Sequence, residues 1–298
     1  MKKLLIGCAV AVGVCVAVLV VGGILVGSWV RGKLPDTKQL EQMQTQLHER
    51  FGAPEAFVPP VNGVPSRDRI EQFVAVRESL ATHRANAAAN LATFMHVVKR
   101  ARPDGRPVME KIVDAISVAK GGTLMAGSMV DYFRTRDRLL LANAMGEGEY
   151  SYYYGLTSFA WLQWDPLAKP EVREALQRVE FLNEVENARS RYGKLLARQL
   201  ENTHKALEGK AGRTPAEEAA LGVLRTELDA ANRTDQFPFL GQVPAAAAAA
   251  LEPYRARLQA ALPQDPAEIA LDLLRNNTES RGRVRWGWRP SGGVHVSD

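Results

Sequence analysis

The first feature of the chain is an unbroken apolar run close to its start. No charged residue occurs from Leu4 to Val30, whereas basic residues stand on both sides of the run. A helix over residues 4–30 would rise about 40 Å, which crosses a hydrocarbon core of about 30 Å with room for tilt. The pattern therefore predicts a single N-terminal transmembrane helix, and we assign residues 1–33 as a transmembrane signal-anchor that contacts the membrane.

Cleavage of this segment is the alternative interpretation. Signal peptides have apolar regions of about 7–15 residues, so the length of this run favours an uncleaved anchor. Positive charges before the run slightly outnumber those after it, which favours an inside N-terminus and a periplasmic or extracellular position for most of the chain. Gly23 and Gly27 have the Gly-x-x-x-Gly spacing that lets two membrane helices pack closely, so a homodimer is an option. The favoured interpretation is that both are ordinary residues of a transmembrane helix.

After residue 33 the apolar residues recur at spacings of three and four, which predicts an all-α soluble domain over residues 34–275. Two very long helices are expected in this multi-helix bundle. One follows Ser66 and continues to about residue 100, and the other begins at Pro170 and continues to Leu200 or beyond. Shorter helices are expected near residues 36–51, 107–120, 128–145 and 146–164.

Several local signals predict where helices begin, end or bend. The pair Gly121-Gly122 is expected to end the helix that starts near residue 107. Thr214 and Glu217 have the spacing of a capping box, in which each side chain binds the backbone N–H of the other residue, and Asp265 with Glu268 repeats it. Pro253 is expected to kink or split an alanine-rich helix.

One stretch, "GEGEYSYYYGLTSFAWLQW" over residues 146–164, contains seven aromatic residues. On a helix, bulky side chains fall on two opposed faces and Ser151, Gly155 and Ser158 form a strip of small residues between them. This is the pattern of a central helix with neighbours on every side. One of those bulky faces, about 100° wide, carries Tyr150, Tyr153, Tyr154, Trp161 and Trp164.

The functional alternative is a tyrosine-lined cavity with Glu147 and Glu149 at its mouth, which would suit sugar rings or a cationic ligand. The candidate ligand-binding residues are therefore these two glutamates and the five aromatic residues of that face. The carboxylates also have a purely structural explanation, because a helix N-terminus stabilises negative charge. If the helix that contains residues 131–138 packs beside this stretch, one of its arginines would reach Glu147 or Glu149.

Known catalytic signatures are absent from the sequence, and the five histidines are scattered, so neither a metal site nor a cofactor is predicted. Ser117 and Lys120 match a Ser-x-x-Lys pattern without its companion motifs and are set aside. The net charge of +5 lies largely at the two ends of the chain, which disfavours nucleic acid as a partner.

The C-terminal segment, residues 276–298, is a basic aromatic tail. Arg283, Arg285, Trp286 and Trp288 are candidate membrane-contact residues, because arginine and tryptophan suit anionic lipid headgroups. Single-stranded nucleic acid is an option only if the domain is cytoplasmic. The even spacing of Val284 and the two tryptophans favours a third interpretation, in which they lie in a groove of the bundle as an extended segment while the arginines stay in solvent.

Together these patterns favour a membrane-anchored, extracytoplasmic helical protein of the cell envelope that binds or scaffolds an envelope protein or a glycan. An enzyme is not favoured and no catalytic residue is assigned. The alternative is a peptidoglycan hydrolase with Glu147 or Glu149 as its general acid.

Overall fold

The computed structural model describes residues 38–61, 63–100, 108–178, 182–234, 238–239 and 243–274. Every element in these residues is helical, which confirms the all-α prediction. The predicted anchor and the C-terminal tail with its four candidate membrane-contact residues lie outside the described residues. Within the described part of the chain, no helix is both long and apolar enough to cross a membrane.

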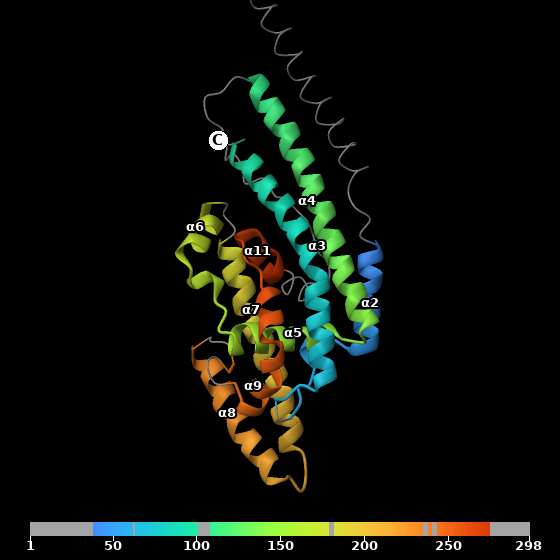
Figure 1. The fold of residues 1–298 in the computed structure, drawn as a ribbon, viewed down its shortest axis with the longest axis vertical. Helices are drawn as coiled ribbons and strands as arrows, with labels where there is room; N and C mark the ends of the chain where they lie inside the picture. The colour runs from blue at the N-terminus through green and yellow to red at the C-terminus, as the bar shows by residue number, and fades with distance from the viewer. Residues whose placement is uncertain are drawn as a thin grey trace, which may run out of the picture.

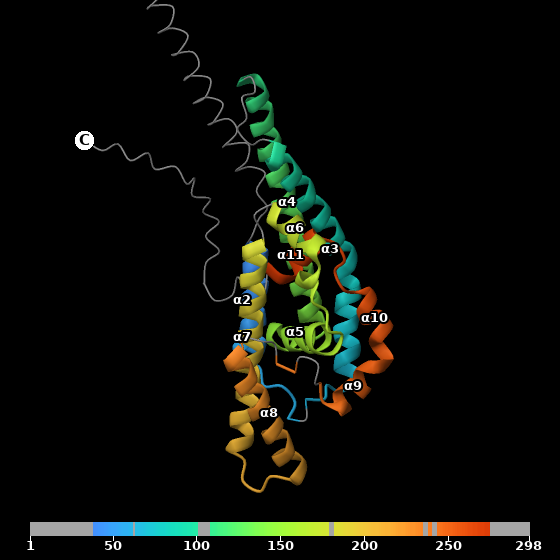
Figure 2. The same cartoon turned by 90° about the vertical axis from the view of Figure 1, so that its left-hand side faces the viewer.

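The two longest helices form an antiparallel hairpin. They are α3 (Arg67–Arg100) and α4 (Val108–Ala142). Both views show them side by side, with one end of the pair standing well beyond the other labelled helices (Figures 1 and 2). We call this projecting end, residues 91–100 of α3 and 108–125 of α4, the arm.

The course of α4 corrects the prediction of two helices separated at Gly121-Gly122. α4 continues through both glycines, and neither has the positive φ that would end a helix there. They instead make room for a side chain of α3, because a Cβ at Gly122 would lie 3.3 Å from the ring of Phe94. The glycine pair therefore marks a close approach of the two helices.

The helix α2 (Lys38–Phe51) packs along α4 and runs in the same direction. At its start, the amide oxygen of Gln39 lies 3.3 Å from a guanidinium nitrogen of Arg134. At its end, Phe51 packs against Gly146, just after α4. Gly52 then turns the chain with φ of 81°, as expected for a helix stop, into the short 3₁₀ helix η1 (Pro54–Ala56).

The second half of the domain corrects another prediction. The very long helix expected from Pro170 consists of two elements, α6 (Pro170–Arg178) and α7 (Leu182–Glu208), on either side of residues 179–181. The start of α7 lies beside α6 (Figures 1 and 2). This arrangement lets Val172 of α6 and Val185 of α7 enter the same core.

The remaining helices complete the domain. α7 and α8 (Pro215–Thr234) form a second hairpin, whose turn lies at the opposite end of the molecule from the arm (Figures 1 and 2). Pro253 lies in η4 (Glu252–Tyr254), which separates α9 (Ala245–Leu251) from α10 (Arg255–Ala260), as predicted. The last described element, α11 (Pro266–Leu274), packs against α3 and α7.

The two predicted capping boxes differ in outcome. The backbone N–H of Thr214 donates to the Glu217 carboxylate at 2.9 Å, and the Glu217 N–H donates to the Thr214 hydroxyl at 3.3 Å, so this box is complete. Asp265 likewise caps α11 by accepting two backbone N–H groups at 2.9 Å. The second box differs from the first, because the Glu268 carboxylate accepts the backbone N–H of Gln264, one residue before the cap, at 3.4 Å and a hydrogen bond from Arg84 at 3.2 Å.

The aromatic stretch lies in the core, as predicted. It forms α5 (Glu147–Tyr154) and a wider π-helical segment, η2 (Gly155–Trp161). All four tyrosines of α5 are buried. The predicted strip of small residues faces α7: Gly155 packs directly on Leu196, and the Tyr192 hydroxyl donates to the backbone carbonyl of Ser151.

The close contact of α5 with η1 gives a test of this packing. A Cβ at Gly148 would lie 2.6 Å from the Pro54 carbonyl oxygen, a backbone atom that cannot rotate away. We expect Gly148→Ala to lower the free energy of unfolding by about 1–3 kcal/mol through overpacking. Gly222→Ala is the matched control, because Gly222 is exposed on α8 and a Cβ added there would have no atom within 4 Å.

That control should raise the stability by about 0.5–1 kcal/mol, since alanine favours helix more than glycine does. Urea denaturation of both variants checks this pair of signs. Equal effects of the two substitutions would contradict the close packing of α5 on η1.

Candidate functional site

Three arginines of α3 face acidic residues from other helices. Residues 69, 77 and 84 are separated by eight and seven positions, which places them within about 80° of one another around α3. Each one pairs with a carboxylate of α5 or α11, so the row connects three helices. The pairs are Arg69–Glu149, Arg77–Asp272 and Arg84–Glu268.

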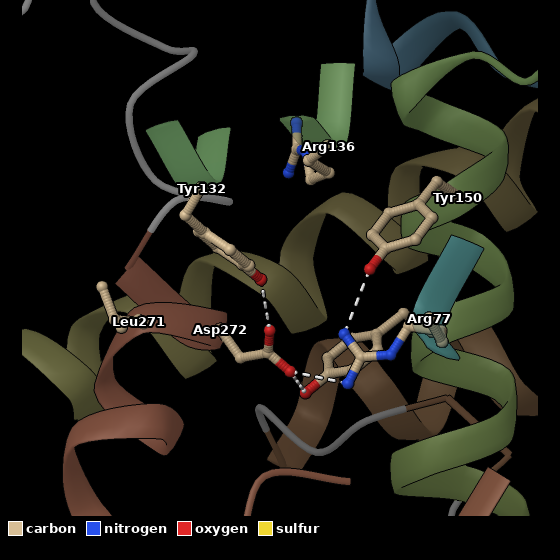
Figure 3. Close-up of a pocket in the computed structure, with 7 residues that line it drawn as sticks. Arg77, Tyr132, Arg136, Tyr150, Leu271 and Asp272 are labelled. Carbon is tan, nitrogen blue, oxygen red and sulfur yellow. Dashed lines mark hydrogen bonds and ion pairs between the residues drawn. The ribbon is translucent and has the colours of Figure 1, made fainter. Parts of the chain in front are cut away.

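The central pair is the most buried. The side chains of Arg77 and Asp272 are each only 3% exposed, and their closest nitrogen and oxygen atoms are 2.8 Å apart. Asp272 also accepts hydrogen bonds from the hydroxyls of Tyr132 at 2.8 Å and Tyr154 at 3.2 Å. Arg77 in turn donates to the Tyr150 hydroxyl at 3.1 Å (Figure 3). We call these five residues the Asp272 cluster.

The cluster brings together four helices. Arg77 comes from α3, Tyr132 from α4, the two tyrosines from α5 and Asp272 from α11. Arg77 makes two further contacts: its guanidinium donates to the Ala261 carbonyl at 3.0 Å and lies 4.7 Å from the centre of the Tyr154 ring. The buried cation is therefore stabilised by a carboxylate, a carbonyl, a hydroxyl and an aromatic face.

Ionisation in the cluster follows from its charges. Burial alone would raise the pKa of Asp272, but the nearby Arg77 and Arg84 and the hydrogen bonds from Arg77 and Tyr132 outweigh burial and lower that pKa. Burial, followed by the charge of Asp272, raises the pKa of Tyr154 well above its ordinary value. Asp272 is thus an anion that accepts hydrogen bonds from neutral tyrosines, in the manner of a structural carboxylate.

A small cavity lies within the cluster. The volume open to the centre of a water molecule is ≈ 10 Å³, which is about the minimum needed for a single water molecule. This cavity is too small for a sugar ring, whereas the tyrosine-lined cavity considered from the sequence would have to hold one. The cavity is lined by Arg77, Tyr132, Arg136, Tyr150, Tyr154, Leu271 and Asp272.

Neither predicted glutamate lines this cavity. Glu147 forms an ion pair with Arg136, and both side chains are 5% exposed. This confirms that an arginine of the segment at residues 131–138 reaches one of the two acids. Glu149 is held by Arg69, whose Nε lies 2.7 Å from a carboxylate oxygen. Each carboxylate is therefore engaged by a guanidinium group from a neighbouring helix.

The five predicted aromatic residues do not share one cavity. Tyr150 and Tyr154 line it, whereas Tyr153 packs against Phe73. Trp161 is half-buried, with the guanidinium of Arg255 stacked 4.2 Å from its ring centre. Trp164 is also half-buried and packs edge-on against Tyr154.

The wider turn after Tyr154 explains this separation. In η2 the backbone N–H of Leu162 donates to the carbonyl of Thr157, five residues earlier, at 2.9 Å. An i→i+5 turn rotates each residue by less than the 100° of an α-helix, so positions that an ideal helix would align diverge. Trp161 is therefore displaced from the tyrosine face predicted for it. Trp164 is displaced for another reason: the helix has ended at Trp161, and Gln163 turns the chain with a φ of 50°.

Sequence reasoning missed the residues that organise the site. Asp272 was detectable, because it is the only charged residue from Ile269 to Leu274 in a helix that is otherwise apolar over that range. Arg77 directly follows the apolar Val76 in α3, which is a weaker signal. Nothing local in the sequence pairs Arg77 with a residue 195 positions later.

No metal centre is found in the part of the chain that the structure describes: none of its histidines, cysteines and acids group in threes or more at a shared site. Comparison with known proteins adds no assignment, since no protein-family model, curated protein or solved structure matches the chain.

The Arg77–Asp272 pair predicts a strongly coupled double-mutant cycle. Asp272→Leu alone should lower the free energy of unfolding by about 3–5 kcal/mol, because it leaves the Arg77 charge buried without its carboxylate. The double variant Arg77→Met/Asp272→Leu should lose much less than the sum of the single losses. Urea denaturation of the four proteins measures this coupling.

The exposed pair Asp131–Arg134 is the matched control. The side chain of Asp131 is 59% exposed, so Asp131→Ala should change the stability by less than about 1 kcal/mol. Additive losses from the two buried substitutions would show that Arg77 and Asp272 do not act as a pair.

The lowered pKa of Asp272 also predicts a pH dependence. A carboxylate whose pKa is lower in the folded state adds stability above its unfolded pKa of about 4 and loses that contribution as the pH falls through the folded value. The difference in unfolding free energy between wild type and Asp272→Asn should therefore be largest above about pH 5 and shrink below about pH 4. A difference that stays constant from pH 7 to pH 3 would argue against an ionised Asp272.

Proposed function

We propose that this chain is a membrane-anchored, extracytoplasmic helical protein that scaffolds or binds a second component of the cell envelope. The observation that carries the proposal is the closed Asp272 cluster. Its polar groups bind one another around a cavity of water size, so the most polar part of the interior offers a substrate no room. Binding is therefore assigned to the outer surface of the domain.

The shape of the molecule supports a scaffold. The α3–α4 hairpin and the α7–α8 hairpin extend in opposite directions from the middle of the bundle, where α5 lies (Figures 1 and 2). The arginine row connects α3 to α5 and α11 and so ties this middle region together. A rigid centre with extended helical ends presents a large surface for its size, which suits contact with a protein or a glycan strand better than enclosure of a small molecule.

The alternative of a peptidoglycan hydrolase gains no support from the geometry. A general acid must lie within hydrogen-bond reach of its substrate, in a cleft that admits the substrate. Glu147 is 5% exposed and bound to Arg136, and Glu149 is bound to Arg69. An assay of peptidoglycan release by the purified protein decides the matter: an activity lost in Glu147→Gln or Glu149→Gln, with melting unchanged, would establish the enzyme.

The topology of the chain is the first test of the scaffold proposal. Alkaline phosphatase fused to the C-terminus becomes active only where its disulfides form, outside the cytoplasm. We expect an active phosphatase fusion, and a protein that stays with membranes after an alkaline wash. Deletion of residues 4–30 should release the domain from the membrane and abolish phosphatase activity, because the segment is proposed to act in both export and anchoring.

A fluorescent-protein fusion at the same position is the control, since that reporter should be dark outside the cytoplasm when exported unfolded. A fluorescent fusion together with an inactive phosphatase fusion would place the domain in the cytoplasm and overturn the proposal.

A further inference from the structure

The direction of the arm is fixed relative to the start of α2. Gln39 at the beginning of α2 contacts Arg134 of α4, and Phe51 at its end packs against Gly146. α2 and α4 therefore run in parallel, away from the tip of the arm. The first described residue of the domain, Lys38, consequently faces the same end of the molecule as the arm.

The arm extends further than the chain that joins it to the proposed anchor. Twenty-six residues of α4 separate Val108 from Arg134, which is about 39 Å along the helix axis. Only eight peptide steps separate Val30, at the end of the apolar run, from Lys38, so that connection spans at most about 28 Å even when fully extended. Any more compact conformation of the connection brings the domain closer to the membrane.

These lengths restrict how the domain lies on the membrane. An arm perpendicular to the bilayer and pointing toward it would pass the membrane boundary by about 10 Å or more, so it must tilt from the membrane normal by at least about 45° to stay outside. At this tilt, with the connection fully extended, the start of α4 reaches the lipid surface, and a more compact connection tilts the arm further and brings its flank closer to that surface. This orientation rests on the proposed function, in which residues 4–30 are an anchor.

The charge of the two ends favours the same orientation. The helical residues of the arm include four basic residues and two acidic ones: Lys99, Arg100, Lys111, Lys120, Glu110 and Asp114. The turn at the other end of the molecule, residues 208–218, has two basic and three acidic residues. Basic segments next to a membrane are attracted to anionic lipid headgroups, whereas the opposite end is not.

The arm also carries an exposed apolar side chain. Leu124 is 56% exposed, more than any other large hydrophobic residue in the described part of the chain. Lys120, one helical turn before Leu124, is exposed as well. An exposed leucine beside a lysine suits a helix that lies in the interfacial region of a bilayer. We propose that the arm lies on anionic lipid headgroups of the same membrane that holds the anchor, and so sets the orientation of the domain.

Lipid-headgroup quenching of a fluorescent label tests this contact. The full-length protein, with Cys8 and Cys15 replaced by alanine, is reconstituted into phosphatidylcholine vesicles that contain phosphatidylglycerol and a headgroup nitroxide lipid. A single label is placed by His96→Cys on the arm or by Lys210→Cys at the opposite end, and both positions are exposed. We expect the label at position 96 to lose fluorescence and the label at position 210 to keep it.

Charge reversal identifies the headgroup chemistry. Lys99→Glu with Arg100→Glu should restore much of the fluorescence at position 96, whereas Lys210→Glu with Arg213→Glu, scored with the same label at position 96, should change nothing. Equal fluorescence at positions 96 and 210, in a protein that remains in the washed vesicles, overturns the contact between the arm and the lipid but not the proposed anchor. Quenching that persists after reversal overturns the role of anionic headgroups. Loss of the protein from the washed vesicles instead overturns the anchor, and with it both proposals.

Discussion

The burial of one carboxylate, Asp272, constrains the whole domain. A charged group inside a protein is costly unless it is paired and hydrogen-bonded, and Asp272 has an arginine and two tyrosine hydroxyls around it. Those partners come from three other helices, so the short helix α11 can dock in only one position along α3. We interpret the cluster as a device that fixes the register of the helices as well as one that stabilises them.

The same constraint explains why the aromatic centre is not an open site. The hydroxyl of Tyr150 accepts a hydrogen bond from Arg77, and that of Tyr154 donates one to Asp272. The Tyr154 ring packs between Arg77 of α3 and Tyr192 of α7, and the Tyr150 ring packs on Phe73 of α3. Little volume is left beside them. A stretch of sequence that resembles a ligand-binding surface is therefore used for internal recognition between helices, and the faces of the bundle remain for contact with other molecules.

Much of the fold could be predicted from the sequence, because amphipathic periodicity and capping are local properties. The end of α2 at Gly52, the start of α3 after Ser66, the complete capping box at Thr214 and the break at Pro253 all follow from neighbouring residues. The glycines at 121 and 122 misled the prediction, because their role depends on Phe94 of another helix. The wider turn after Tyr154 likewise has no signal that helical periodicity detects.

The candidate site was less predictable, because its pairing is long-range. The sequence indicated an arginine for Glu147 or Glu149, and Arg136 reaches Glu147, but the Asp272 cluster joins residues nearly two hundred positions apart. Hydrogen exchange measures whether this cluster holds the fold together. We expect the amides of α11 near Asp272 to exchange only with global unfolding, at the same free energy as the amides of α3 near Arg77. Exchange of α11 at a much lower free energy, while α3 stays protected, would show that α11 detaches alone and would contradict the central role of the cluster.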